Sequence, residues 1–166
     1  RFKPIKKIDA LKYLEWDPAK KHILFGADPE KYVKNFKLAK EAFNLLTIKN
    51  IELHYLSNIP NEIMPYYLNS SDVLLLTSLW EGSPNIIKEA MACNTPIVST
   101  DVGDVKQIIS NTDGCFITTF DAEDVSYKIT KAINYNNKTN GRQNIKHLDS
   151  SVISKIIINE YEKVAL

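Results

Sequence analysis

Residues 73–92 read Val73-Leu74-Leu75-Leu76-Thr77-Ser78-Leu79-Trp80-Glu81-Gly82-Ser83-Pro84-Asn85-Ile86-Ile87-Lys88-Glu89-Ala90-Met91-Ala92. An apolar run typical of a buried strand comes first, and a loop with Gly, Ser and Pro leads into a helical pattern. Ser83 suits the N-cap of that helix, and Pro84 suits its first position because a missing N–H costs nothing there. The stretch predicts a strand, a tight turn and a helix start.

Two acids, Glu81 and Glu89, frame this turn. The free N–H groups and the macrodipole of a helix start favour phosphate, and a carboxylate deeper in the helix can accept hydrogen bonds from sugar hydroxyls. Glu89 lies five residues after Pro84, which is about 7–8 Å along the axis and roughly a phosphate-to-ribose distance. The alternative is a capped surface helix with two solvated acids.

Strand-like runs recur on both sides of this unit, and helical patterns fill most of the gaps between them. Strands are expected at residues 22–25, 51–56, 73–77, 96–99 and 115–118. Helices are expected over 33–46, 61–69, 103–109, 121–133 and 150–163, and a polar loop over 134–141. In the first of these helices, an apolar stripe is expected to pack on the sheet: Phe36, Ala39, Phe43 and Leu46. The alternation predicts an α/β fold, a Rossmann-like doubly wound parallel sheet with helices on both faces.

Composition places the chain among ordinary soluble domains. Its 166 residues fit one domain, with 44% hydrophobic and 25% charged residues. The net charge of +1 gives no support for a nucleic-acid partner. No apolar run reaches the roughly 18 residues that span a bilayer, and no signal peptide is evident, so a cytoplasmic location is expected.

The first residues are basic, with Arg1, Lys3, Lys6 and Lys7 close together. One interpretation is a solvated linker, or a crossover from an upstream domain. The other is contact with an anionic membrane surface, which would make the protein peripheral at the inner membrane face.

Cysteine and histidine usage predicts neither a disulfide framework nor a structural metal. Only Cys93 and Cys115 occur, and both are expected to be small core residues. His22, His54 and His147 are far apart in the sequence, and none stands at ligand spacing from a Cys, Asp or Glu.

In a doubly wound sheet, ligands bind beyond the carboxyl ends of the strands, near the switch in strand order. The loops after residues 25, 56 and 77 all open there. No G-x-G-x-x-G follows any expected strand, and the P-loop signature is absent as well. A dinucleotide site is therefore disfavoured.

The two acids and the residues that follow them match the pattern of a known family. The Glu-x7-Glu spacing of Glu81 and Glu89 is followed by Ala90-Met91-Ala92-Cys93-Asn94-Thr95-Pro96-Ile97-Val98-Ser99-Thr100-Asp101-Val102-Gly103-Asp104. This resembles the nucleotide-sugar-binding half of retaining glycosyltransferases with the GT-B fold, family 4. The resemblance runs from about residue 22 to the end and is specific over 57–109. It implies that Glu89 binds the ribose hydroxyls of the donor and that Glu81 contacts hydroxyls of the donor sugar.

Further donor-binding residues follow from the same resemblance. Many relatives carry two basic residues after the first strand; Ala27 replaces one, and Lys34 matches the other, with Lys31 as a substitute. The alternative is two solvated lysines beside a helix start. The base would lie against Asn58 and Ile59, although a plain strand-to-helix turn would look similar.

The turn itself departs from the usual family form at Ser83-Pro84, where an aromatic and a Gly are common. Because Pro84 has no N–H, the donor is expected to depend on the remaining loop residues, namely Gly82, Ser83, Asn85 and Ile86. Trp80 either belongs to the core, as aromatics at strand ends usually do, or lines the pocket. Gly103 is expected to meet a backbone need, and Asp101 and Asp104 to cap the helix that follows.

The resemblance implies a glycosyltransferase of polysaccharide biosynthesis. It would transfer a hexose from a nucleotide-diphosphate sugar, expected to be a UDP-sugar, to a hydroxyl of a glycan or glycolipid, without a metal or other cofactor. Residues 1–166 would form the C-terminal donor-binding domain. An N-terminal acceptor domain is expected to lie outside these residues, so this domain alone is expected to bind donor without transferring it.

Two other classes stay open. A nucleotide-sugar epimerase of GT-B architecture would need acid/base residues from both halves, and product analysis would separate it. A non-catalytic sugar-nucleotide-binding subunit would work with another chain, and an upstream acceptor domain in the same reading frame would exclude it.

Overall fold

A five-stranded parallel sheet lies at the centre of the structure, a computed structural model that describes residues 1–164. Its strand order is β2-β1-β3-β4-β5. The strands are β1 (Lys21–Phe25), β2 (Ile51–Tyr55), β3 (Val73–Leu76), β4 (Ile97–Thr100) and β5 (Cys115–Thr118). The chain builds outward from β1 to β2 and then returns to β3, so the switch in strand order lies between β1 and β3. The predicted doubly wound sheet is confirmed, with strand ends within one residue of the expected positions.

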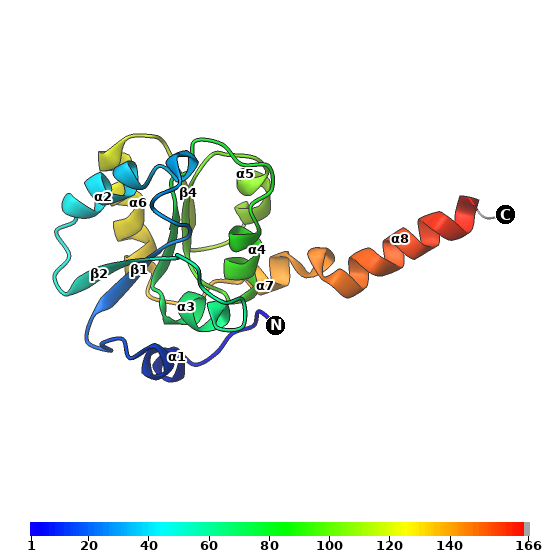
Figure 1. The fold of residues 1–166 in the computed structure, drawn as a ribbon, viewed down its shortest axis with the longest axis horizontal. Coiled ribbons are helices and arrows are strands. Elements are labelled where there is room, and N and C mark those ends of the chain that lie inside the picture. The colour runs from blue at the N-terminus through cyan, green and yellow to red at the C-terminus, as the bar shows by residue number, and fades with distance from the viewer. Residues whose placement is uncertain (165–166) are drawn as a thin grey trace.

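Helices cover both faces of this sheet (Figure 1). They are α1 (Lys7–Leu14), α2 (Phe36–Asn44), α3 (Met64–Ser70), α4 (Asn85–Ala92), α5 (Val105–Ile109), α6 (Ala122–Tyr135), α7 (Gly141–Asn144) and α8 (Ser150–Val164), with short 3-10 turns η1 (Tyr32–Lys34) and η2 (Lys146–Leu148). Helices α2 and α6 pack on one face, and α3, α4 and α5 on the other.

The central strands are buried on both faces, which explains their unbroken apolar runs. In β3, Leu74 and Leu76 point into the core beneath α3 and α4, whereas Val73 and Leu75 point into the core beneath α2 and α6. The expected stripe of α2 belongs to this second core, so that prediction is confirmed. Each fully buried aliphatic side chain of this kind stabilises the fold by about 1.5–3 kcal/mol.

Several helix starts differ from the expectation: α3 begins at Met64 and α5 at Val105, three and two residues late. The helix expected over 33–46 is interrupted, because Asn35 adopts a left-handed φ of 51° between η1 and α2. Helix α4 begins at Asn85, one residue late, because Pro84 keeps an extended ψ of 117° and takes the N-cap position that Ser83 was expected to hold.

The basic start of the chain is not a solvated linker. Lys7 Nζ lies 2.7 Å from Asp72 Oδ1, and Ile5 N donates to the side-chain oxygen of the fully buried Asn69 at 2.8 Å. Helix α1 packs against α3, where the rings of Tyr13 and Tyr66 stack with centroids 3.9 Å apart. The linker alternative was wrong for Ile5 and Lys7, because their anchors lie some sixty residues away in the sequence, whereas Arg1, Lys3 and Lys6 are exposed.

Asparagine supplies most of the left-handed turns. Among residues 1–164, seven residues other than glycine have positive φ, and six of them are asparagines, at positions 35, 50, 58, 94, 111 and 136. Most of these positions lie at the ends of helices or just before strands. A short side chain that can bond locally tolerates this conformation better than other residues do.

The last helix projects from the rest of the molecule (Figure 1). Helix α8 buries none of its side chains, and Ile156, Ile157 and Ile158 are each about half exposed, at 51%, 49% and 53%. Within the described residues, none of the helices combines the length and apolar character needed to cross a bilayer.

Candidate functional site

The loops at the carboxyl ends of the strands converge at the switch between β1 and β3. Gly26 directly follows β1, where an added Cβ would lie 3.0 Å from Leu74 Cδ1 and 3.3 Å from Ile86 Cγ1, close enough that these side chains would have to shift. The loop after β1 is therefore pressed against the start of α4. This contact brings two of the three predicted site loops together.

Lys34 and Glu81 form an ion pair at this end of the sheet. Their side chains are only 23% and 15% exposed, so solvent screens the pair less than a surface pair. Ser78 Oγ donates to the same carboxylate oxygen, Oε1, at 2.7 Å. Lys34, predicted to contact the diphosphate, and Glu81, predicted to contact the sugar, are therefore in direct contact with each other.

The segment after β3 holds Lys34 in place through the backbone. Thr77 Oγ1 donates to Lys34 O at 3.1 Å and to Asn35 O at 2.9 Å, and Leu79 N donates to Val33 O at 2.8 Å. Sequence reasoning did not single out Thr77 or Ser78 as site residues. The signal available was two hydroxyl residues at the carboxyl end of a buried strand, where polar side chains need partners.

The turn before α4 rests on the loop after β4. Gly103 has φ of 56°, and an added Cβ would lie 2.0 Å from Gly82 O. The expectation that the backbone requires glycine at this position is confirmed. Asp104 N also donates to Gly82 O, at 3.2 Å. Ser83 Oγ donates to Asp104 Oδ2 and accepts from Lys88 Nζ at 2.6 Å, which is why it does not cap α4. Asp104 takes the N-cap position of α5, but its Oδ2 bonds Ser83.

Glu89 is half-buried on α4 and lines a surface cavity of about 360 Å³. Burial raises the pKa of its carboxyl, and the charge of Arg1 partly offsets that rise. The basic residues around this cavity are Arg1, Lys88, Arg142 and Lys146. Neither Lys34 nor Glu81 lines it, so the structure does not bring the two predicted acids into one cavity.

The other predicted residues surround these features. Lys31, Asn58 and Asn85 are exposed, whereas Ile59 and Ile86 pack against the same core cluster. Asn58 has a left-handed φ of 52°. Trp80 is 61% exposed, so its assignment to the core was wrong.

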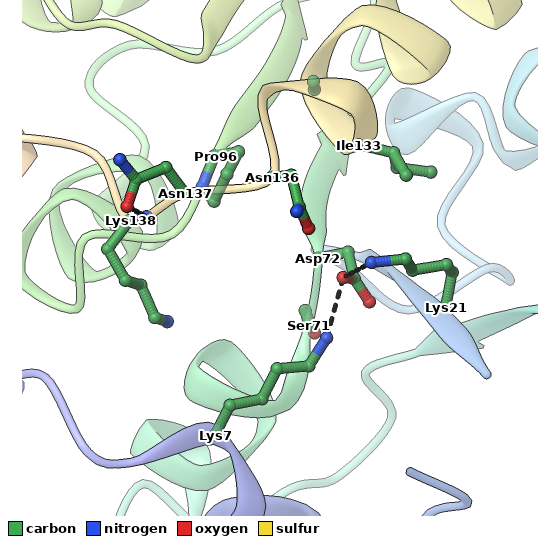
Figure 2. A pocket seen from close by; sticks show the side chains of 10 residues that line it. Lys7, Lys21, Ser71, Asp72, Pro96, Ile133, Asn136, Asn137 and Lys138 are labelled. Atoms are coloured by element: carbon green, nitrogen blue, oxygen red, sulfur yellow. Dashed lines mark hydrogen bonds and ion pairs between the residues drawn. The ribbon is translucent and has the colours of Figure 1, made fainter. Parts of the chain in front are cut away.

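A second cavity, of about 380 Å³, opens at the amino ends of the strands (Figure 2). Asp72, just before β3, accepts there from Lys7 Nζ at 2.7 Å and Lys21 Nζ at 3.2 Å. Burial raises the pKa of Asp72, but its hydrogen bonds from Lys7 and His22 N and the nearby lysine charges hold it below its usual value. Since ligands of doubly wound sheets bind at the carboxyl ends, we exclude this cavity from the candidate site.

Two histidines that the sequence separates are neighbours in the fold. His22 Nδ1 lies 3.0 Å from His54 Nε2, and Glu52 lies beside both rings. The expectation that no histidine lies near an acid at ligand spacing was therefore wrong. The missed signal is the two-residue spacing of Glu52 and His54, which places both on one face of a strand.

The model of the family described as Glycosyl transferases group 1 matches residues 8–147, most of the chain. N,N'-diacetylbacillosaminyl-diphospho-undecaprenol alpha-1,3-N-acetylgalactosaminyltransferase of Campylobacter jejuni is 31% identical over 103 residues, which are 58% of this chain and 27% of that protein. The phosphatidylinositol N-acetylglucosaminyltransferase GPI3 subunit of Saccharomyces cerevisiae is 31% identical over 86 residues, which are 52% of this chain and 19% of that protein.

Solved structures confirm the fold. Alr3699/HepE of Anabaena, solved in complex with UDP-glucose, superposes with a TM-score of 0.74 at 15% identity, over 96% of this chain and 52% of that one. The chain thus spans about half of that structure and less than a third of the two curated relatives. The expected architecture, one Rossmann-like half of a GT-B fold, is confirmed. With the family model matched across most of its length, the chain belongs to the Glycosyl transferases group 1 family.

Proposed function

We propose that this chain is the donor-binding half of a retaining glycosyltransferase of family 4. The enzyme transfers a hexose from a nucleotide-diphosphate sugar, a UDP-sugar, to a hydroxyl of a glycan or glycolipid in polysaccharide biosynthesis. Family membership supports the reaction class, and the similar fold that was solved with UDP-glucose supports the donor. The curated relatives named for undecaprenol diphosphate and phosphatidylinositol support a lipid-linked acceptor.

The Lys34–Glu81 ion pair is the observation that carries this proposal. Without donor, each charge satisfies the other at the carboxyl end of β3. When donor binds, the ammonium of Lys34 contacts the diphosphate, and the carboxylate of Glu81 accepts a hydrogen bond from a hydroxyl of the sugar. Ser78 keeps Glu81 oriented during this exchange through its 2.7 Å hydrogen bond.

The chemistry needs positive charge where the leaving group forms. The bond between the anomeric carbon and the diphosphate oxygen breaks, and negative charge accumulates on the nucleoside diphosphate. Lys34 and the first amides of α4 stabilise that charge, so protein groups supply what a metal ion would otherwise supply. In a front-face mechanism the acceptor hydroxyl attacks from the same side, and its proton passes to the departing diphosphate.

Glu89 is assigned to the ribose. Burial raises the pKa of the half-buried Glu89 carboxyl, and sugar hydroxyls that donate to the carboxylate would replace the hydration that burial removes. The basic residues around its cavity suit a polyanionic nucleotide. The acceptor site lies on a second, N-terminal domain, and this domain alone binds donor without transferring it. The enzyme works on the cytoplasmic side, peripheral to the membrane that holds its acceptor.

Titration of the chain with UDP by calorimetry tests the donor assignment. Glu89→Ala is expected to weaken UDP binding by about 1.5–3 kcal/mol, about 10- to 150-fold, because a charge-assisted hydrogen bond to the ribose is lost. Glu41→Ala, at an exposed acid on α2, is the matched control and should leave the affinity unchanged. Equal UDP affinity in the Glu89 variant would refute the ribose role, and no UDP binding by the unchanged chain would refute the proposed function.

A second pair of titrations separates sugar from nucleotide. If Glu81 holds the sugar, Glu81→Gln should weaken UDP-glucose more than UDP. A loss of the same size for both ligands would show that Glu81 acts only through Lys34.

A further inference from the structure

We propose that His22, Glu52 and His54 bind a zinc ion at the amino-terminal part of the sheet, away from the donor site. The three residues come from neighbouring parallel strands, with His22 of β1 in register with Glu52 of β2. Glu52 and His54 are two residues apart on β2, so their side chains share a face of the sheet. Nothing in the proposed transfer reaction uses them.

The ligand atoms already have the spacing of a tetrahedral site. His22 Nδ1 lies 3.0 Å from His54 Nε2 and 3.7 Å from Glu52 Oε2, and His54 Nε2 lies 3.5 Å from Glu52 Oε2. Zinc bonds of about 2.0–2.1 Å at tetrahedral angles place their ligand atoms about 3.3–3.4 Å apart. Each of the three distances differs from that value by only a few tenths of an ångström.

Outer contacts hold the ligands in the required form. His22 Nε2 lies 2.9 Å from the backbone oxygen of Asp17. Because that oxygen only accepts, Nε2 carries the proton, and the lone pair of Nδ1 faces His54 and Glu52. A histidine that binds a metal generally donates its other N–H in this way.

Glu52 and His54 are oriented by their own neighbours. Lys20 Nζ donates to Glu52 Oε1 at 2.5 Å, which leaves Oε2 for the rings. Trp16 stacks on His54 with ring centroids 3.5 Å apart and planes 11° from parallel. When a metal binds, His54 offers its Nε2 lone pair and carries its proton on Nδ1 instead.

Burial and charge favour an uncharged imidazole pair. The His22 side chain is fully buried and that of His54 is 20% exposed, so two imidazolium ions in contact would be costly. Two neutral imidazoles and one carboxylate match the donor set of zinc sites that keep one position open. Glu52 is 35% exposed, which gives a fourth ligand, water, access from the surface.

Zinc titration against a chromophoric chelator tests the site in the full chain. The expected result is one equivalent of Zn²⁺ bound, with affinity reduced more than tenfold in Glu52→Gln and in His54→Gln, since loss of an outer contact alone already costs about 10- to 100-fold. His147→Gln, at the exposed third histidine, is the control and should bind zinc normally. UDP affinity should be unchanged in all three variants, which separates this site from the proposed function.

A second measurement does not depend on ligand substitutions that could affect folding. In Trp80→Phe the only remaining tryptophan is Trp16, which stacks on His54. Co²⁺ should quench its fluorescence saturably, and Zn²⁺ should reverse the quenching. The proposal is overturned if the chain binds no Zn²⁺, if Glu52→Gln and His54→Gln bind it as tightly as the unchanged chain, or if Co²⁺ leaves Trp16 fluorescence unaltered.

Discussion

At the level of single residues, the candidate site is held by contacts between loops rather than within one motif. Lys34 reaches Glu81 from η1, and Thr77 fixes η1 through two backbone oxygens. Ser78 then bonds the acid itself. The pair is thus positioned before any donor arrives, which lowers the entropy that binding must overcome.

The contact of Gly103 with Gly82 gives a matched pair of substitutions. Gly103→Ala should lower the free energy of unfolding by about 2 kcal/mol or more, because its φ of 56° disfavours a side chain and a Cβ would lie 2.0 Å from Gly82 O. At Gly82 an added Cβ has no other atom within 4 Å, so Gly82→Ala should change the free energy of unfolding by less than about 1 kcal/mol. Urea unfolding measures both, and equal losses would contradict the steric argument.

Residue identities in the site were more predictable than their contacts. The resemblance picked out Lys34 and Glu81, which the structure brings together. It could not show that Ser83 bonds Asp104, because the partner lies on the loop after another strand. Nor could it show the pairing of His22 with His54, which depends on the register of β1 and β2.

At the level of elements, α6 has the best-defined start. Asp121 accepts from the backbone N–H groups of Glu123 and Asp124 at 2.8 and 3.0 Å. Asp124 in turn accepts from Thr119 N at 2.8 Å and from the hydroxyl of Thr118 at 2.9 Å. Asp121 caps the first turn, and Asp124 ties that turn to the two threonines before the cap, so the two acids together fix how the chain enters the helix.

Asp124→Asn should lower stability at neutral pH by about 0.5 kcal/mol, a small value because the carboxylate is partly exposed and solvent weakens its interactions. The hydrogen bond from Thr119 N is the main cause that holds the pKa of Asp124 below its usual value. In the window between the folded and unfolded pKa, the unfolded chain binds more protons. The stability from Asp124 is therefore present above about pH 4 and is lost as the pH falls through the lower, folded value.

Urea unfolding at several pH values below neutrality measures this effect. The difference between the unchanged chain and Asp124→Asn should shrink as the pH falls below about 4. Asp113→Asn, at an exposed acid in a loop, is the control. A difference that stays constant at low pH would show that the Asp124 charge plays no part.

Element types were predictable because strands and helices differ in apolar period, whereas several helix starts were not. The apolar stripe of α2 continues smoothly past Asn35, so the pattern alone gives no reason to stop there. The left-handed turn at Asn35 and the bonds from Thr77 to this segment decide the boundary. Both involve residues outside the helix.

At the level of the whole molecule, the chain divides into a packed body and α8. Helix α8 buries none of its side chains, although α6, of similar length, buries five. Most helical stability in proteins comes from packing of an apolar face. Helix α8 should therefore unfold locally, without opening the sheet.

Deleting residues 150–166 tests that division. The free energy of unfolding of the remaining chain should change by less than about 0.5 kcal/mol, since no buried contact of α8 is lost. Ile129→Ala in α6, at a fully buried side chain, should cost about 2–5 kcal/mol in the same urea experiment. A comparable loss from the deletion would mean that α8 supports the body.

The asparagine turns bear on how the chain behaves before it folds. A chain with only five glycines in 166 residues keeps a Cβ at nearly every bend. Its denatured ensemble samples fewer backbone states than that of a glycine-rich chain. Forming each left-handed bend therefore costs less conformational entropy. Glycine at such a bend would relieve the local backbone strain but would also enlarge the unfolded ensemble, so the two effects on stability oppose each other.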